Sequence, residues 1–257
     1  MGPPVGRRKV VRKPFSLEFF DVNAAFGFDP KGRVDARLEK VLDLAGRANV
    51  RRLCVCSLKG AFYDYELGNI ETLRICHGDG RLIPTATIDP RRYPGGRREV
   101  RSLKEQGFRV LRLFPEHQNW PYRYAPFYRI LDELAEYPMV LLLPARGLGS
   151  LTELSHLIPA DAPFPTIVLG VNYWLISEAL AVLPERPNLY LDTSLLDSPD
   201  AYELLVDEIG PERLLFGSGL PFTGPGAPAL ALERAQIPDR AKEAIARLNL
   251  EGLLDAV

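Results

Sequence analysis

The side chains best suited to chemistry each lie in or after a short apolar run of the sequence. Guanidinium groups can grip a carboxylate or phosphate with two parallel hydrogen bonds, and an imidazole or a carboxylate can transfer a proton. We interpret Asp21 and His117 as candidate catalytic groups. The candidate groups for binding a small anionic molecule are Asn23, Arg112, Arg146, Asn172, Asp192 and Ser218.

Several of these residues also have purely structural interpretations. Asp21 can hold backbone amides or pair with an arginine, and Asn23 can orient a ligand or satisfy a neighbouring loop. Arg112 and Arg146 can bind an anion. They can instead form buried ion pairs with Asp21 and Asp192 that leave the site without net charge. The residue types alone leave both interpretations open.

The elements that must position these residues alternate regularly along the chain. Short runs rich in branched and aromatic residues predict strands, and apolar residues at helical spacing predict helices between them. The predicted strands are residues 17–23, 52–57, 82–88, 108–114, 139–145, 166–171, 189–193 and 213–217. The predicted helices are residues 33–48, 69–77, 97–106, 126–136, 150–157, 174–183, 198–209, 227–235 and 238–248. Ser198 is expected to cap the helix at 198–209, with Pro199 at its first position.

Eight strand–helix units predict an α/β fold, a single (β/α)8 TIM barrel. An open doubly wound sheet is the competing fold, but it usually has fewer strands, and no Gly-x-Gly-x-x-Gly turn follows the first strand. We expect one barrel domain at residues 15–257 after a basic tail at residues 1–14. Parallel strands all end on one face. The barrel mouth should therefore collect Asp21, Arg112, Asn172, Asp192 and Ser218.

Alternation along the first strand makes a sharper prediction. Asp21 and Asn23 share one face of the strand, while Phe20 and Val22 share the other. We expect the apolar pair to face the helices and the polar pair to point into the mouth.

The histidines and aromatic residues have limited roles in this barrel. Only His117 is expected in a loop at the mouth, where it serves in acid–base chemistry or is a plain surface residue beside Glu116. His77 and His156 fall at helix ends. Ser218 lies in Gly-Ser-Gly without the nucleophile elbow of a serine hydrolase, so we exclude that class. The nearby aromatic residues form a lid or pack on the rim: Trp120, Tyr122, Tyr124, Phe127 and Tyr128.

Charge and composition restrict the partners. The chain has 257 residues with 32 basic and 33 acidic side chains, a net charge of −1, which argues against nucleic-acid binding. The sequence predicts neither a membrane span nor a signal peptide. Three cysteines favour a reducing, cytoplasmic location, and a homo-oligomer stays open. The first fourteen residues form a phosphate-binding arm or a flexible, solvated terminus, and we favour the terminus; their basic residues are Arg7, Arg8, Lys9, Arg12 and Lys13.

Four stretches of the chain carry a family pattern. Residues 20–27 match an Asp-x-His-x-His-x-Gly opening, and residues 107–115 match Gly-Phe-x-x-hydrophobic-Lys/Arg-Leu-x-Pro. Residues 188–194 match a later strand, and residues 213–221 match Arg-hydrophobic-Leu-Phe-Gly-Ser-Asp-x-Pro, the most specific of the four. The chain therefore resembles the amidohydrolase superfamily, in particular its amidohydrolase-related branch of small metal-dependent hydrolases and decarboxylases. The resemblance extends over nearly the whole chain and includes a closing helix with Asn249.

The resemblance also implies a metal site, and here the sequence departs from the family. The family binds one or two divalent metals through histidines on strands one, five and six and an aspartate on strand eight, which also acts as a base on metal-bound water. The matching positions here are Asn23, Ala25, Pro144, Val171 and Gly219. Only Asn23 has a polar side chain, and an amide is a weak, neutral ligand. We therefore predict no tightly bound metal and no cofactor.

Two functions from different classes follow. In the first, an amidohydrolase-like barrel has lost metal-dependent hydrolysis and binds a small anionic molecule or scaffolds a partner. In the second, the mouth belongs to a metal-independent hydrolase or lyase, with His117, Asp21 and the arginines acting on a carboxylate-bearing substrate. Loss of turnover on changing His117 would favour the second.

Overall fold

The computed structural model describes residues 15–92 and 98–257, so the predicted basic tail lies outside the described residues. Eight parallel strands form one sheet in the order β1 to β8. The backbone amide of Val22 donates to the carbonyl oxygen of Phe216 at 3.0 Å and that of Ala25 to Leu220 at 2.8 Å, which joins the segment after β8 to β1. The predicted (β/α)8 TIM barrel is therefore confirmed. The strands are β1 (Phe19–Phe26), β2 (Val50–Ser57), β3 (Leu82–Ala86), β4 (Val110–Arg112), β5 (Val140–Pro144), β6 (Thr166–Leu169), β7 (Leu189–Asp192) and β8 (Leu214–Leu215).

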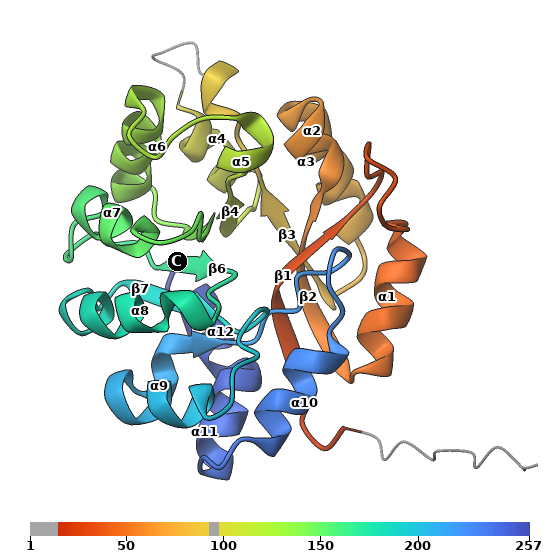
Figure 1. The fold of residues 1–257 in the computed structure, drawn as a ribbon. Helices are drawn as coiled ribbons and strands as arrows, with labels where there is room; N and C mark the ends of the chain where they lie inside the picture. Colours follow the sequence, from red (N-terminus) through yellow and green to blue (C-terminus); the bar gives the residue numbers. More distant parts are fainter. Residues whose placement is uncertain (1–14, 93–97) are drawn as a thin grey trace, which may run out of the picture.

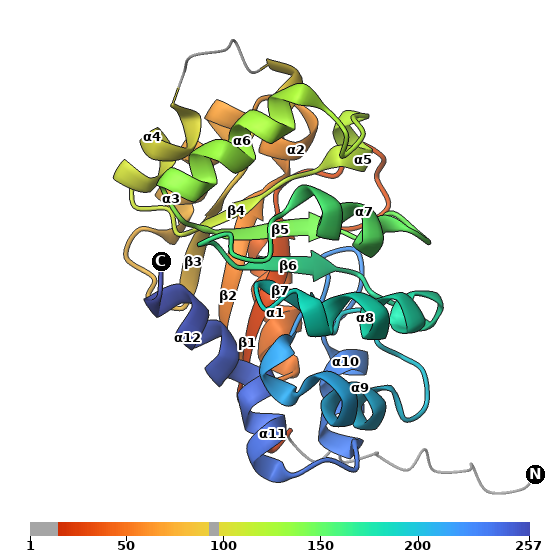
Figure 2. The ribbon, with the colours of Figure 1, turned by 90° about the vertical axis from the view of Figure 1, so that its left-hand side faces the viewer.

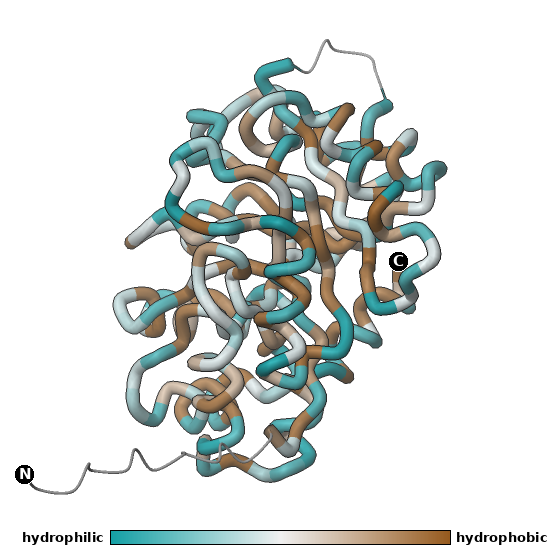
Figure 3. The backbone as a smooth tube through the Cα atoms, turned by 90° about the vertical axis from the view of Figure 1, so that its right-hand side faces the viewer, coloured by the Kyte–Doolittle hydropathy of each residue, from teal (hydrophilic) through white to brown (hydrophobic). Residues whose placement is uncertain are grey.

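Helices surround the barrel (Figure 1). Their apolar residues recur at helical spacing, as in α6, where Phe127, Ile130, Leu131 and Leu134 are buried. Hydrophobic and hydrophilic positions accordingly alternate along much of the outer chain (Figure 3). The helices are α1 (Leu38–Arg47), α2 (Leu58–Phe62), α3 (Tyr65–Cys76), α4 (Glu99–Glu105), α5 (Pro115–Gln118), α6 (Ala125–Glu136), α7 (Ser150–Leu157), α8 (Ile176–Val182), α9 (Ala201–Ile209), α10 (Gly226–Arg234), α11 (Asp239–Glu243) and α12 (Asn249–Asp255).

Several helices differ from the sequence prediction, including α1 and α3, which begin at Leu38 and Tyr65. The helices α2 and α5 span only five and four residues, too few to show an apolar period, and neither was predicted. The helix predicted from Ser198 begins at Ala201 instead. Asp200 stands at its N-cap with a left-handed φ of +57°, and this turn prevents the chain at Ser198 and Pro199 from continuing into the helix.

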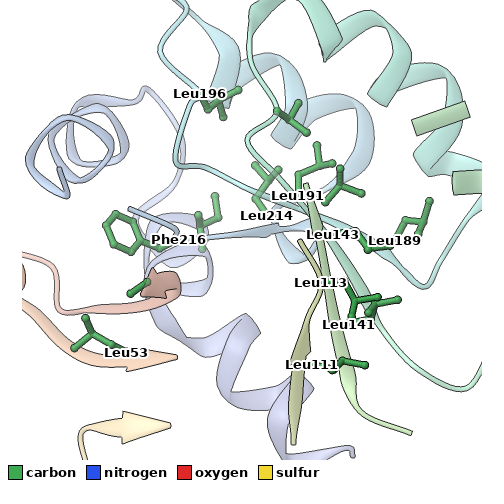
Figure 4. Packing of buried hydrophobic residues seen from close by; sticks show 14 of the residues in the cluster. Leu53, Leu111, Leu113, Leu141, Leu143, Leu189, Leu191, Leu196, Leu214 and Phe216 are labelled. Atoms are coloured by element: carbon green, nitrogen blue, oxygen red, sulfur yellow. The ribbon is translucent and has the colours of Figure 1, made fainter. Parts of the chain in front are cut away.

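Apolar packing divides into an outer and an inner core. The outer core lies between strands and helices and includes Leu111, Leu113, Leu141 and Leu143 (Figure 4). The inner core fills the barrel with residues from the strands, and Leu250 and Leu254 of α12 complete it. Figure 2 shows α12 at the end from which the strands start. The opposite end, where the strands finish, is the end at which this fold places binding sites.

The first strand breaks the expected alternation. Phe20 and Val22 belong to the inner core, so the prediction that they face the helices is wrong. The pairing of β1 with β2 shifts register between Asp21 and Ala24. A β-bulge of this kind re-aims the side chains that follow it, and it allows Asn23 to reach the mouth although Val22 points inward.

In residues 15–92 and 98–257, every helix falls short of what a bilayer-spanning segment requires in length or apolar character.

Candidate functional site

A cavity of about 310 Å³ opens at the ends of the strands. Segments at or after β1, β4, β5, β6, β7 and β8 contribute to its wall, as the barrel architecture predicts for a binding site. Its polar lining includes Asn23, Arg33, Arg112, Glu116, His117 and Ser194. Its apolar lining includes Phe114, Pro144, Leu169, Leu195 and Phe222. This mixture of apolar wall and few polar groups is typical of a small-molecule site.

Arg112 is the last residue of β4 and places a buried, unsatisfied donor in this region. Its Nη1 atom has no hydrogen-bond partner among the described residues. Its guanidinium lies over the Phe114 ring, 4.9 Å from the centroid. Burial raises the pKa of the Cys56 thiol, and the positive charge of Arg112 opposes that rise. Arg33, the other cationic side chain of the lining, is instead paired with Asp29 at 3.1 Å.

Neither carboxylate considered as a partner of Arg112 forms an ion pair with it in the described part of the chain. Asp192 accepts a hydrogen bond from Asn23 Nδ2 at 2.7 Å and another from the Gly170 amide at 2.6 Å. Burial raises the pKa of Asp192, while these hydrogen bonds and the positive charge of Arg112 oppose the shift. The charge of Arg112 therefore acts on Asp192 without direct contact.

Asn23 connects this carboxylate to the cavity. Its Nδ2 atom donates to Asp192 Oδ2 and, at 3.4 Å, to Ser194 Oγ. Its Oδ1 atom is buried and has no partner within residues 15–92 and 98–257. The site thus contains one unsatisfied donor on Arg112 and one unsatisfied acceptor on Asn23.

Asp21 and Ser218 join β1 to the segment after β8 and do not line the cavity. The Asp21 carboxylate accepts from the backbone amides of Asn23 at 2.9 Å and Ser218 at 3.0 Å, and from the Ser218 hydroxyl. Asp21 is fully buried, and burial raises its pKa from 3.8 to about 6 although the hydrogen bonds oppose the shift. Of the two interpretations of Asp21, this geometry supports the structural one, in which its carboxylate accepts hydrogen bonds from backbone amides.

His117 lines the cavity from α5. Its ring meets Phe62 edge-on at 4.8 Å and Phe114 at 5.7 Å. Partial burial lowers the pKa of His117, and the positive charges of Arg112 and Arg33 lower it further. A neutral imidazole at this place can accept a proton.

Three further predicted binding residues are absent from the cavity lining: Asp192, which contacts Asn23, and Arg146 and Asn172, which lie elsewhere. Arg146 is exposed on the rim, with its guanidinium 5.4 Å from the Tyr122 ring centroid and Nη1 donating to the Trp120 carbonyl at 3.4 Å. The Asn172 side chain accepts from the Trp174 amide at 3.1 Å and caps a short helical turn.

The aromatic residues after β4 support the rim. Trp120, Tyr122 and Phe127 are buried and contact one another with centroids 5.3 to 6.4 Å apart. The interpretation of these three residues as a lid is therefore wrong, because their rings pack inside the protein.

Three lining residues, Arg33, Ser194 and Phe222, were not predicted from the sequence. Ser194 lies two positions after Asp192, so strand periodicity could have indicated it. Arg33 was placed in a helix that begins only at Leu38, and no local pattern marks it or Phe222 as part of the site.

The amidohydrolase family model matches residues 72–254. The chain belongs to the amidohydrolase family. Among solved structures it is similar to 5-carboxyvanillate decarboxylase from Sphingomonas paucimobilis, with a TM-score of 0.73 and 13% identity over 93% of this chain and 99% of the other. It is also similar to 2,6-dihydroxybenzoate decarboxylase from Rhizobium, with a TM-score of 0.70 and 13% identity over 93% and 99% of the two chains. At this identity the structural likeness establishes the fold alone. A comparison with curated proteins found no match.

The amidohydrolase family implies a metal, and the donor atoms at this mouth do not fit one. The described residues hold no group of three or more His, Cys, Asp or Glu side chains that could bind a metal ion. Ala25 and Val171 are buried in the apolar cores. Gly219 has a left-handed φ of +68°, and a Cβ atom there would collide with Oγ1 of Thr223. At the strand-eight position an aspartate would therefore have to displace the Thr223 hydroxyl, although aspartate tolerates such a φ, as Asp200 does at +57°.

Proposed function

We propose that this amidohydrolase-family barrel binds a small carboxylate-bearing molecule at its mouth through Arg112, without metal-dependent hydrolysis. The observation that supports the proposal is the buried Nη1 atom of Arg112, which has neither a hydrogen-bond acceptor nor an ion-paired carboxylate in the described residues. An unsatisfied buried donor is costly, and an anionic acceptor from a ligand would remove that cost. We further propose a cytoplasmic location, where Cys54, Cys56 and Cys76 would stay reduced.

The volume of the cavity and the compounds named for two structurally similar proteins favour a small carboxylate-bearing ligand. A cavity of about 310 Å³ lies at the small end of the range for ligand pockets. Two structurally similar proteins are named as decarboxylases of 5-carboxyvanillate and 2,6-dihydroxybenzoate, and both of those compounds carry a carboxylate.

A thermal-shift series tests this proposal. Propionate and citrate, at fixed ionic strength, should raise the melting temperature of the parent protein, by about 2–4 °C for each kcal/mol of stabilisation through binding. Arg112→Met should abolish the rise and leave the fold intact, because no ion pair is lost. Arg146→Met, the same change on the exposed rim, should behave as the parent. An equal rise in the Arg112→Met variant, or none in the parent, would refute the proposal.

A metal-independent lyase or hydrolase is the second candidate, and the position of His117 supports it. His117 lines the cavity together with Arg112, and its lowered pKa keeps the imidazole neutral, as a general base requires. Asp21 takes no direct part in this scheme because it lies outside the lining. Turnover of a carboxylate substrate by chelator-treated protein, lost in His117→Gln while propionate binding persists, would support catalysis; a rate unchanged by His117→Gln would exclude this residue as the base.

A further inference from the structure

We infer that the ligand of this mouth carries a hydrogen-bond donor, a hydroxyl or an ammonium group, in addition to its carboxylate, and that Asn23 recognises this donor. The inference rests on the proposed function, because it concerns the second half of the molecule whose carboxylate would bind Arg112. The observation behind it concerns Asn23 and not Arg112: the Oδ1 atom of Asn23 is buried and has no hydrogen-bond partner in the described residues.

The amide of Asn23 has only one favourable orientation. Its Nδ2 atom donates to Asp192 Oδ2 at 2.7 Å and to Ser194 Oγ at 3.4 Å. A flipped amide would place two acceptors, Asn23 Oδ1 and the Asp192 carboxylate, against each other. Asp192 itself is fixed by the Gly170 amide at 2.6 Å. The buried carboxylate therefore acts as a positioning group that keeps Oδ1 available.

Asn23 also belongs to the cavity and is shielded from bulk solvent. It lines the same space as Arg112, yet only 5% of the residue is exposed. A buried carbonyl oxygen without a donor is unfavourable. The residues that line the mouth thus include an unsatisfied donor, Nη1 of Arg112, and an unsatisfied acceptor, Oδ1 of Asn23.

A simple carboxylate can satisfy only the first of these two atoms. Its oxygens are acceptors when ionised, so they would complement Arg112 and leave Asn23 Oδ1 unpaired. A hydroxy acid or an amino acid brings both an anionic acceptor and a donor. One additional neutral hydrogen bond should strengthen binding by about three- to tenfold.

Four three-carbon probes test the inference: propionate, lactate, 3-hydroxypropionate and alanine. Dissociation constants are measured by titration calorimetry at one pH and ionic strength for the parent, Asn23→Leu and Arg112→Met. We expect at least one donor-bearing probe to bind the parent more tightly than propionate, by about three- to tenfold for the hydroxyl of lactate or 3-hydroxypropionate and by about tenfold or more for the charged ammonium of alanine. The hydroxy acids and alanine distinguish a hydroxyl from an ammonium donor, and the two hydroxy acids distinguish its position. Asn23→Leu should remove the preference, measured within that variant as the ratio of the dissociation constant of propionate to that of each donor-bearing probe, and Arg112→Met should weaken all four probes.

The outcomes separate this inference from the proposed function. If propionate binds the parent but no donor-bearing probe binds better, or if the preference survives in Asn23→Leu, the role of Asn23 is refuted and carboxylate binding stands. If none of the four probes binds the parent, the proposed function fails. Should Asn23→Leu not fold, 2-methoxypropionate on the parent replaces it: this methyl ether of lactate keeps the oxygen but lacks the donor, and binding equal to that of lactate would overturn the inference.

Discussion

At the residue scale, Asp21 is a fully buried carboxyl group that takes its hydrogen bonds from β1 and from the segment after β8. Burial raises its pKa to about 6, so the ionised form is less stable in the folded protein than in the unfolded chain. The stability linked to this group is fully present below about pH 4 and is lost as the pH rises to about 6.

Asp21→Asn should flatten this pH dependence. The amide has the shape of the protonated acid and does not ionise. We expect the free energy of unfolding of the parent to fall by up to about 3 kcal/mol more than that of Asp21→Asn between pH 4 and pH 7. Asp192, whose pKa is also raised, is present in both proteins, and its contribution cancels apart from its repulsion with Asp21, the smallest cause of the Asp21 shift. Urea unfolding at unit pH steps checks this, and parallel curves for the two proteins would contradict the shifted pKa.

At the scale of elements, the loop between β8 and α10 fixes the mouth through Gly219. Its φ of +68° lies in the left-handed region, and the space for a Cβ atom is taken by Oγ1 of Thr223. Gly32 has a similar φ of +61° but open space around it. The two glycines therefore separate the cost of the backbone conformation from the cost of the collision.

Gly219→Ala should destabilise the protein by more than about 2 kcal/mol, whereas Gly32→Ala should cost about 1 kcal/mol. Chemical unfolding of both variants measures the difference. Equal losses would show that the loop after β8 relaxes around the new methyl group. In that case an aspartate at this position would also fit, and the argument against the strand-eight metal ligand would lose its steric part.

At the scale of the whole molecule, the barrel is closed at one end and open at the other. Leu250 and Leu254 of α12 complete the inner core at the end where the strands start (Figure 2). The cavity with Arg112 lies where the strands finish. Stability and binding are therefore assigned to opposite ends of the same barrel.

Leu254→Ala should cost about 2–5 kcal/mol of unfolding free energy, because a buried leucine leaves a cavity in the inner core. Leu248→Ala, at a position 42% exposed, should change the stability by less than about 1 kcal/mol. Neither variant should alter the affinity for propionate once folded. A loss of affinity in folded Leu254→Ala would show that the two ends are coupled, against this separation.

The sequence by itself determined the strand–helix succession and the face on which the strands end. Apolar runs and helical periods are local properties, so the eight strands were predicted at nearly their observed places. Arg112 and Asp192 end their strands, and Asn172 and Ser218 follow theirs, as predicted for one barrel end. The matched stretches likewise indicated the amidohydrolase family, because a family motif is a property of the chain; three of the four lie within the residues that the family model matches, and residues 20–27 lie before them.

Only the tertiary structure decided what each polar residue does at that end. The bulge in β1 comes from pairing with β2 and re-aims Asn23 toward the mouth, while Phe20 and Val22 face the inside of the barrel, against the prediction. Whether Arg112 is ion-paired depends on distances between strands four, one and seven, which no local pattern contains. Asn172 and Arg146 were predicted from correct strand ends. Their side chains nevertheless cap a turn and lie on the rim, since the path of each loop sets where its polar groups find partners.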